Sequence, residues 1–130
     1  MRAKCVEELQ VFQKALAAAD AVSAIIKRPT FDRDPRLRQQ LGASSSSVPA
    51  RIAEGFEQKS DRHFAHYLYI ARGSAQETRT HLRVASGRGH LPSREAESTR
   101  SMYQEIASMT TGLIRHLENE DRKHRWVPSR

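Results

Sequence analysis

Two glutamates, Glu54 and Glu77, are the first candidates for chemistry, because a pair of carboxylates can act as a general acid and a general base. Glu54 lies in a helical pattern whose apolar face is formed by Val48, Ile52 and Phe56. On an ideal helix Glu54 points away from that face. We therefore interpret Glu54 as an exposed or intersubunit residue that forms an ion pair or a cap with a nearby arginine, and we predict no catalytic residue.

Histidines suggest two kinds of metal site, and neither pattern is complete. His63 and His66 lie one helical turn apart, but no third ligand is in view, so a polar helix start explains them better. A di-iron bundle needs Glu-x-x-His on two helices, whereas Glu77 and His81 are four residues apart and no second copy exists. The glycines match no phosphate loop or dinucleotide fingerprint. We predict no metal and no cofactor.

The basic residues are a stronger functional lead. Cationic side chains on one helix flank can follow phosphates, and a tryptophan can stack on a base. Alternatively, flanking arginines can pair with glutamates of the adjacent helix, as they do in many bundles. The candidate nucleic-acid-binding residues are Arg72, Arg79 and Arg83 on one flank of an expected third helix, Arg88 just beyond it, and Lys123, Arg125 and Trp126 in an expected basic tail.

Charge and composition limit the class of protein. The 130 residues include 22 Lys and Arg against 15 Asp and Glu, a net charge of +7, and the pI is about 10.2. Such a balance favours an anionic partner, or it serves solubility alone. The single cysteine, Cys5, excludes an intrachain disulfide. No stretch approaches the ~18 apolar residues of a membrane span, and polar residues from Glu7 onward exclude a signal peptide. We predict a cytoplasmic protein with no membrane partner.

The periodicity predicts an all-α protein. Good helix formers dominate, and apolar residues recur at steps of three and four. The length suits a single domain with one core. Four helices with short connections predict an antiparallel, up-down-up-down four-helix bundle. The expected helices span residues 6–27, 35–56, 61–86 and 94–122, and a basic tail occupies 123–130.

Each expected helix has one apolar stripe that should face the core. Asp34 and Ser60 precede the second and third helices and are expected N-caps. The stripes are Leu9, Phe12, Leu16, Ala19, Val22 and Ile26 in the first helix; Leu37, Leu41, Ser45, Val48, Ile52 and Phe56 in the second; Phe64, Leu68, Ala71, Ala75, Thr78, Leu82 and Ala85 in the third; and Met102, Ile106, Met109, Leu113 and Leu117 in the fourth, widened by Tyr103 and Ile114.

The middle of the second helix is unusual in composition. Residues 42–47 read GASSSS, which by composition alone is a flexible linker. The apolar stripe nevertheless stays in phase from Leu41 to Val48 and Ile52, so we favour a continuous helix whose small side chains let a neighbouring helix approach closely. Pro49 is then expected to kink this helix and Gly55 to end it.

The third helix has a second apolar flank. Tyr67, Ile70, Ser74 and His81 widen its apolar face beyond what one packed neighbour needs, which favours a homo-oligomer. The residues that we assign to structural or subunit-interface roles are Pro49, Glu54, Gly55, Tyr67, Ile70 and Glu77.

Several segments together resemble a known family. They are LQVFQKA at 9–15, SVP at 47–49, IAEG at 52–55, and IARGS at 70–74 with Glu77. This chain looks like the small bacterial four-helix-bundle proteins named after 23S rRNA intervening sequences. The resemblance covers nearly the whole chain and implies an antiparallel bundle assembled as a ring of five subunits. The family also includes relatives of accessory proteins of diversity-generating retroelements, which bind nucleic acid and a reverse transcriptase.

The chain departs from that family at two informative places. A basic pair of the family is replaced here by Gly42-Ala43, and an asparagine before IAEG is replaced by Arg51. Loss of the basic pair removes charge from a place where RNA contacts could be proposed. From the high pI, the arginine flank and the resemblance, we expect a non-catalytic oligomeric bundle protein of undefined role that binds RNA or DNA through a basic surface. The alternative is a scaffold for a protein encoded nearby, with no nucleic-acid role.

Overall fold

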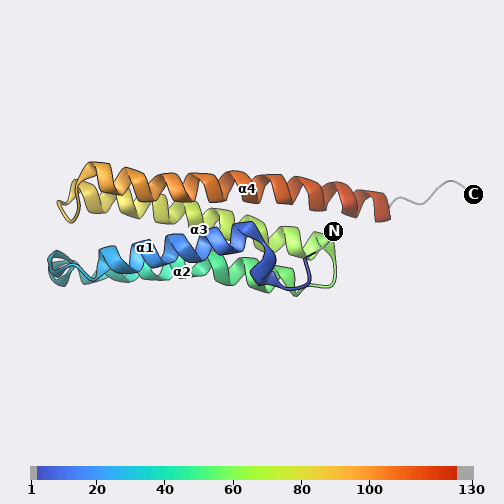
Figure 1. Cartoon of the computed structure of the whole chain (residues 1–130), viewed down its shortest axis with the longest axis horizontal. Helices are drawn as coiled ribbons and strands as arrows, with labels where there is room; N and C mark the ends of the chain where they lie inside the picture. Colours follow the sequence, from blue (N-terminus) through green and yellow to red (C-terminus); the bar gives the residue numbers. More distant parts are fainter. Residues whose placement is uncertain (1–2, 126–130) are drawn as a thin grey trace, which may run out of the picture.

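A computed structural model describes residues 3–125 of the chain. Over this range every regular element is helical (Figure 1). Two short 3-10 helices, η1 (Val6–Glu8) and η2 (Pro29–Arg33), accompany four α-helices: α1 (Gln10–Ile26), α2 (Pro35–Phe56), α3 (Asp61–Gly87) and α4 (Ser93–Arg125). The all-α class expected from the periodicity is therefore confirmed.

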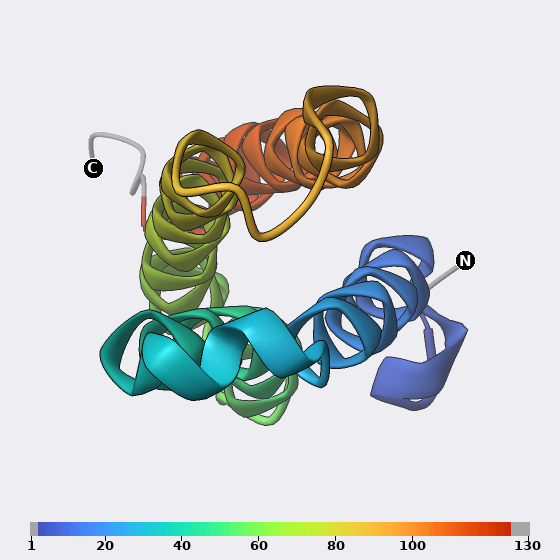
Figure 2. The same ribbon diagram turned by 90° about the vertical axis from the view of Figure 1, so that its left-hand side faces the viewer.

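The four long helices pack into a bundle around one apolar core. Successive helices are joined by short connections at alternating ends of the molecule (Figure 1). α3 makes the most extensive contacts, with α2 and with α4, whereas α1 packs against α2 and, less extensively, against α4. Figure 2, viewed along the bundle, shows α4 above, α2 below, α3 to the left and α1 to the right. Within residues 3–125, no helix combines the length and apolar character that a membrane crossing requires.

The first expected helix is interrupted, and the prediction of one helix over 6–27 is wrong. The chain makes the single 3-10 turn of η1 and then bends at Leu9, whose backbone is extended (φ −76°, ψ 124°), before α1 begins at Gln10. The side chain of Gln13 donates a hydrogen bond to the carbonyl of Glu7 across this bend (2.7 Å). Glu7 and Glu8 are exposed, so burial of their side chains does not hold this turn on the axis of α1.

The stripe of α1 is rotated by about one position from the expected one. Leu16, expected in the core, is 44% exposed, and Ala19 and Ile26 are only half-buried. The expected stripe placed Leu16 and Ala19 in the core, whereas the alanines one position earlier, Ala15 and Ala18, are the residues that are buried. The residues of α1 that face the core are Val11, Phe12, Ala15, Ala18, Val22 and Ile25.

α2 spans the range that its periodicity predicts, and residues 42–47 are helical, so the linker interpretation is wrong. Two serines of this segment, Ser44 and Ser47, face α3. The Thr78 hydroxyl donates to Ser44 Oγ at 2.8 Å, and the hydroxyls of Ser47 and Ser74 lie 2.9 Å apart. Ser44 and Ser45 are buried, and their small volume brings the two helix backbones together. Pro49 lies buried inside the continuous helix.

α2 also supplies a cap to the end of α1. Arg38 Nε donates to the carbonyl oxygen of Ile26 at 2.8 Å, and its Nη2 donates to the carbonyl of Arg28 and to Asp32 Oδ1. The last carbonyls of a helix have no partner within that helix, so a guanidinium from the next helix satisfies one of them.

α3 follows its expected seam closely, because every seam residue except half-buried Phe64 is buried. Ser60 is the N-cap, accepting a hydrogen bond from the amide of His63 at 3.2 Å. Asp34 occupies the N-cap position of α2, and its carboxylate pairs with Arg88 and His90.

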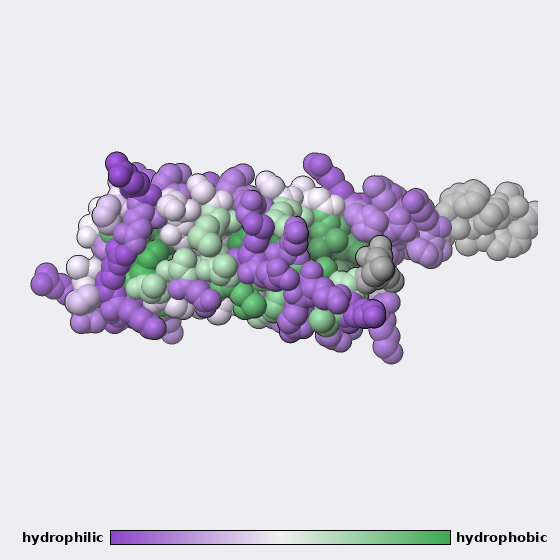
Figure 3. Space-filling model, in the orientation of Figure 1, coloured by the Kyte–Doolittle hydropathy of each residue, from purple (hydrophilic) through white to green (hydrophobic). Residues whose placement is uncertain are grey.

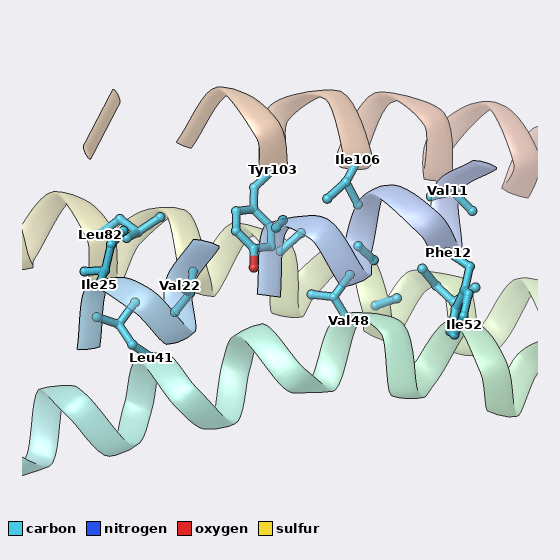
Figure 4. Close-up of a cluster of buried hydrophobic side chains, with 14 of the residues drawn as sticks. Val11, Phe12, Val22, Ile25, Leu41, Val48, Ile52, Leu82, Tyr103 and Ile106 are labelled. Atoms are coloured by element: carbon cyan, nitrogen blue, oxygen red, sulfur yellow. The ribbon is translucent and has the colours of Figure 1, made fainter. Parts of the chain in front are cut away.

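α4 turns a slightly different face to the core than expected. Tyr103 and Ile114, assigned to its flank, are buried, whereas Met102, Met109 and Leu113 are half-buried. Figure 4 shows Tyr103 and Ile106 reaching from α4 into the core, near Val22 and Val48. α4 continues to Arg125, so Lys123 belongs to the helix and the tail expected from 123 does not begin there.

Candidate functional site

The expected arginine flank of α3 contacts α4 at its first member. Arg72 Nη1 donates to Thr111 Oγ1 at 3.0 Å, and the Arg72 guanidinium lies 5.0 Å from the centre of the Tyr69 ring. The Tyr69 hydroxyl in turn donates to Glu118 at 3.0 Å. This hydrogen bond to a carboxylate favours the neutral phenol and raises the pKa of Tyr69. Arg72 is therefore positioned by the seam between α3 and α4.

Arg79 and Arg83, the next two arginines of the flank, differ in how exposed their side chains are. Arg79 is half-buried and donates to Gln76 Oε1 at 3.0 Å, while Arg100 of α4 donates to its backbone carbonyl. Arg83 is exposed. Among residues 3–125, none of Arg72, Arg79 and Arg83 forms an ion pair with a glutamate of a neighbouring helix, so their charge is not cancelled by a bundle-flank pair.

Arg88 belongs to a different cluster, which joins the two connections at one end of the bundle. Its Nη1 donates to both carboxylate oxygens of Asp34, at 3.0 and 3.2 Å. His90 Nε2 lies 2.9 Å from Asp34 Oδ2, and its Nδ1 lies 3.0 Å from Thr30 Oγ1. The His90 ring stacks on Phe31 with 4.1 Å between ring centres. We call Thr30, Phe31, Asp34, Arg88 and His90 the clasp.

The clasp sets the charge state of its acid. The hydrogen bond from His90 is the main cause that lowers the pKa of the Asp34 carboxyl, and the hydrogen bond from Arg88 lowers it further. The His90 side chain is 8% exposed and Asp34 18% exposed, so the pair is shielded from solvent by Phe31 and the connections. Periodicity could not find this cluster, because His90 and Asp34 are far apart in the sequence and lie in loops.

The two glutamates considered for acid and base chemistry are separated along the bundle. Glu54 is exposed and pairs with Arg51 one turn away. Glu77 is exposed and lies 3.4 Å from His81 Nε2. Ser44 faces Thr78 across the helix pair, so Glu77 lies level with the serine segment, several turns from Glu54. The structure therefore gives these carboxylates no shared site.

Gly55 lies in a tight contact between α2 and α3. A Cβ placed on it would lie 2.8 Å from Phe64 Cδ1 and 2.8 Å from Tyr67 Cβ. Gly55 is buried and still helical, so it serves packing here and the helix ends only at Phe56. Tyr67 is half-buried in this contact, whereas Ile70, one turn later, is 40% exposed.

The histidines considered for metal binding lie at the start of α3, and Lys123 and Arg125 of the expected tail lie at the end of α4. His63 Nδ1 contacts the Ser60 hydroxyl and His66 contacts the Tyr67 ring. In residues 3–125 no three His, Cys, Asp or Glu side chains converge as a metal site. Lys123 pairs with Glu120 at 3.2 Å, Arg125 is the last residue of α4, and Trp126 lies outside the described residues.

One shallow, open groove lies where α1 ends. It is lined by Ser23, Ile26, Lys27 and Arg38. Arg38 is already hydrogen-bonded to the carbonyl oxygens of Ile26 and Arg28, and no Asp, Glu, His or Cys is among the lining residues. It is a surface depression beside cationic side chains and has the character of a contact surface.

Comparison with known proteins agrees with the fold. A protein from Bacteroides thetaiotaomicron, described as a protein with unknown function from the S23 ribosomal protein family, is similar in crystal structure, with a TM-score of 0.74 and 24% sequence identity. The match covers 80% of this chain and 97% of that one. No curated protein sequence matches the chain.

A family model gives the stronger result. The model of the 23S rRNA-intervening sequence protein family matches residues 7–112, which include α1, α2, α3 and most of α4. The resemblance drawn from the segments at 9–15, 47–55 and 70–77 is thereby confirmed. The chain belongs to the 23S rRNA-intervening sequence protein family.

Proposed function

We propose that this protein is a non-catalytic, cytoplasmic bundle protein that binds nucleic acid through its basic surface. The observation that carries the proposal is the state of the α3 flank. Arg72 and Arg79 are half-buried, Arg83 is exposed, and none of the three is neutralised by a carboxylate of a neighbouring helix within the described residues. Together with the net charge of +7, this flank can attract phosphates by long-range electrostatics.

The proposal includes assembly of several copies. The bundle is taken as antiparallel and the assembly as a ring of five, as the family resemblance implies. Tyr69 and Ile70 on α3 are large apolar residues with 43% and 40% of their surface exposed. Placing them against another copy would remove apolar surface from water, and would multiply the charge of one chain over a single particle.

A second candidate is a protein-interaction scaffold. Figure 3 shows apolar residues gathered over α1 and along its border with α4, bounded by hydrophilic side chains. Leu16, 44% exposed, belongs to α1, and Met109 and Leu113 of α4 are half-buried. Such a band can receive the apolar face of a protein encoded nearby. A pull-down that survives nuclease treatment supports this candidate over the first.

A salt titration tests nucleic-acid binding. Structured RNA is titrated with purified protein in a filter-binding assay over a series of salt concentrations, after the absorbance ratio has been used to check for nucleic acid that co-purifies. The expected result is an affinity whose logarithm falls linearly with the logarithm of salt concentration. Absence of binding at low salt, or binding with no salt dependence, overturns the proposal.

A further inference from the structure

The clasp brings two distant parts of the chain to one end of the bundle. The first part runs from the end of α1 through η2 to the start of α2, and the second from the end of α3 to the start of α4. This end lies at the left of Figure 1 and faces the viewer in Figure 2. Besides the Asp34 contacts, Arg28 pairs with Glu95 between the two parts. Residues 27–38 and 83–97 therefore form one surface, which we call the basic end.

The charge of the chain is concentrated there. Residues 27–38 and 83–97 hold eight Lys and Arg and four Asp and Glu, a net charge of +4 out of +7. At the opposite end, residues 3–10, 51–66 and 112–125 hold eight of each kind and are neutral. Over residues 3–125 the bundle is therefore electrically asymmetric along its length, although neither helix periodicity nor total charge indicates this asymmetry.

All four acidic residues of the basic end form ion pairs, so none of them is left to offset the charge of the unpaired cations there. Asp32 pairs with Arg38, Asp34 with Arg88 and His90, Glu95 with Arg28, and Glu97 with Arg100. Within the described part of the chain, five exposed cations at this end are left with no ion pair. They are Lys27, Arg33, Arg36, Arg83 and Arg94.

The chemistry of these five side chains fits a phosphate backbone. Four are arginines, whose planar guanidinium donates two parallel hydrogen bonds to phosphate oxygens. The aromatic rings of the basic end are Phe31 and His90, which are buried against each other, so no ring of the described segments is exposed for stacking on a base. Single-strand binding depends on such rings, whereas backbone contacts to a duplex do not.

An acidic protein fits this end less well. Protein interfaces draw most of their affinity from a few aromatic or aliphatic anchors that fill pockets. The large apolar side chains in these segments, Phe31, Leu37 and Leu91, are buried in the bundle. The exposed side chains that remain are cationic, with no large apolar side chain among them. Such a surface is suited to a regular array of phosphates.

We propose that the basic end is the surface through which this protein binds the phosphate backbone of duplex nucleic acid, independently of base sequence. This inference rests on the proposed function and gives it a location and a substrate class. The clasp holds the two connections together, so the five cations keep fixed relative positions. Because consecutive arginines lie on separate elements, the surface spans the width of the bundle end.

The test compares two triple variants with equal loss of charge. The first, Arg33→Gln, Arg36→Gln and Arg94→Gln, removes exposed side chains of the basic end; the control, Lys59→Gln, Arg62→Gln and Arg115→Gln, removes exposed cations of the neutral end. Fluorescence anisotropy with duplex RNA, duplex DNA and single-stranded probes of scrambled sequence is recorded over a salt series. Circular dichroism checks that both variants remain helical.

The expected result is weaker duplex binding by the first variant alone, with a salt slope reduced by roughly one for each phosphate that the variant no longer neutralises. Equal affinities of the two variants overturn the location while leaving nucleic-acid binding intact, whereas a wild-type protein that binds no probe overturns the proposed function itself. Preference for the single strand overturns the duplex assignment. In a competition experiment, poly-glutamate that displaces the labelled duplex as readily as unlabelled duplex does would assign the surface to an acidic protein instead.

Discussion

Asp34 and His90 are 56 residues apart in the sequence, and Asp34 Oδ2 lies 2.9 Å from His90 Nε2. This contact joins the connection between α1 and α2 to the connection between α3 and α4. Arg88 and Thr30 complete it from the same two connections. The two helical hairpins are therefore fixed to each other at this end by hydrogen bonds as well as by the apolar core.

Replacing Asp34 should change stability in a pH-dependent way. The lowered pKa of Asp34 means that the folded protein favours the carboxylate more than the unfolded chain does. Its stabilisation is therefore complete above the ordinary aspartate pKa of about 3.9 and is lost as pH falls through the lower folded value. We expect Asp34→Asn to be less stable than wild type at neutral pH, with a gap that narrows below ~pH 4.

Urea unfolding followed by circular dichroism at a series of pH values measures this effect. Asp32→Asn is the matched control, because Asp32 is a more exposed aspartate of the same end that pairs with Arg38 outside the clasp. If wild type and Asp34→Asn show the same dependence on pH, the clasp does not control stability.

Gly55→Ala should destabilise the bundle by overpacking. The new methyl group would meet Phe64 Cδ1 and Tyr67 Cβ, both at 2.8 Å, and the Phe64 carbonyl oxygen at 3.2 Å. Forcing α2 and α3 apart costs about 1–3 kcal/mol. Gly112→Ala is the control, because no atom lies within 4 Å of its added Cβ, and alanine in a helix should raise stability by about 0.5–1 kcal/mol. Thermal unfolding of both variants with shifts in the same direction would contradict overpacking at Gly55.

Tyr103→Phe should be tolerated or stabilising. Tyr103 is fully buried, burial raises the pKa of its hydroxyl, and that hydroxyl has no hydrogen-bond partner among the described residues. Removing an unsatisfied buried hydroxyl should raise the free energy of unfolding by about 1 kcal/mol. Tyr103→Ala should instead lower it by about 3–5 kcal/mol, as expected for a large cavity. A marked loss of stability in Tyr103→Phe, measured by chemical denaturation, would mean that the hydroxyl has a partner such as a buried water.

Ile70→Glu should dissociate the proposed oligomer. Ile70 is 40% exposed on α3, so a charge there disturbs the single chain little but would be buried in an assembly that uses this face. We expect light scattering to give a smaller particle for Ile70→Glu and an unchanged helical signal. Leu16→Glu, on α1 and 44% exposed, should leave the assembly intact. A wild-type protein that scatters as a monomer at micromolar concentration contradicts assembly, and the opposite ranking of the two variants places the interface on α1.

For α2 and α3, sequence periodicity predicted the features that are set within a single helix, namely its extent and its buried face. The stripes of α2 and α3 are long and regular, so their burial followed from the 3.6-residue repeat, and the phase from Leu41 to Ile52 identified the serine segment as helix. The buried faces of α1 and α4 lie about one position away from the expected ones. Both helices are apolar over a wider arc, and packing against the neighbouring helices determines which part of that arc is buried. In α1 the covered part contains Ala15 and Ala18, whereas Leu16 is exposed.

The candidate site depended on relations between helices and could be predicted only in part. The shared flank of Arg72, Arg79 and Arg83 follows from spacing within α3. That Arg72 binds Thr111 while Arg88 turns to Asp34 follows from tertiary packing across loops. The basic end could not be predicted, because its unpaired cations are spread over η2, α2, α3, α4 and the residue that follows α1.

Arg38 has a kinetic consequence. Its guanidinium closes the last turn of α1 from the first turn of α2, through contacts spanning only 10 to 12 residues of chain. Contacts of short sequence separation cost little loop-closure entropy, so the α1–α2 hairpin can be organised early in folding. We expect Arg38→Met to slow refolding more than it accelerates unfolding in stopped-flow experiments. The reverse would mean that the cap forms only after the transition state, once α3 and α4 have docked.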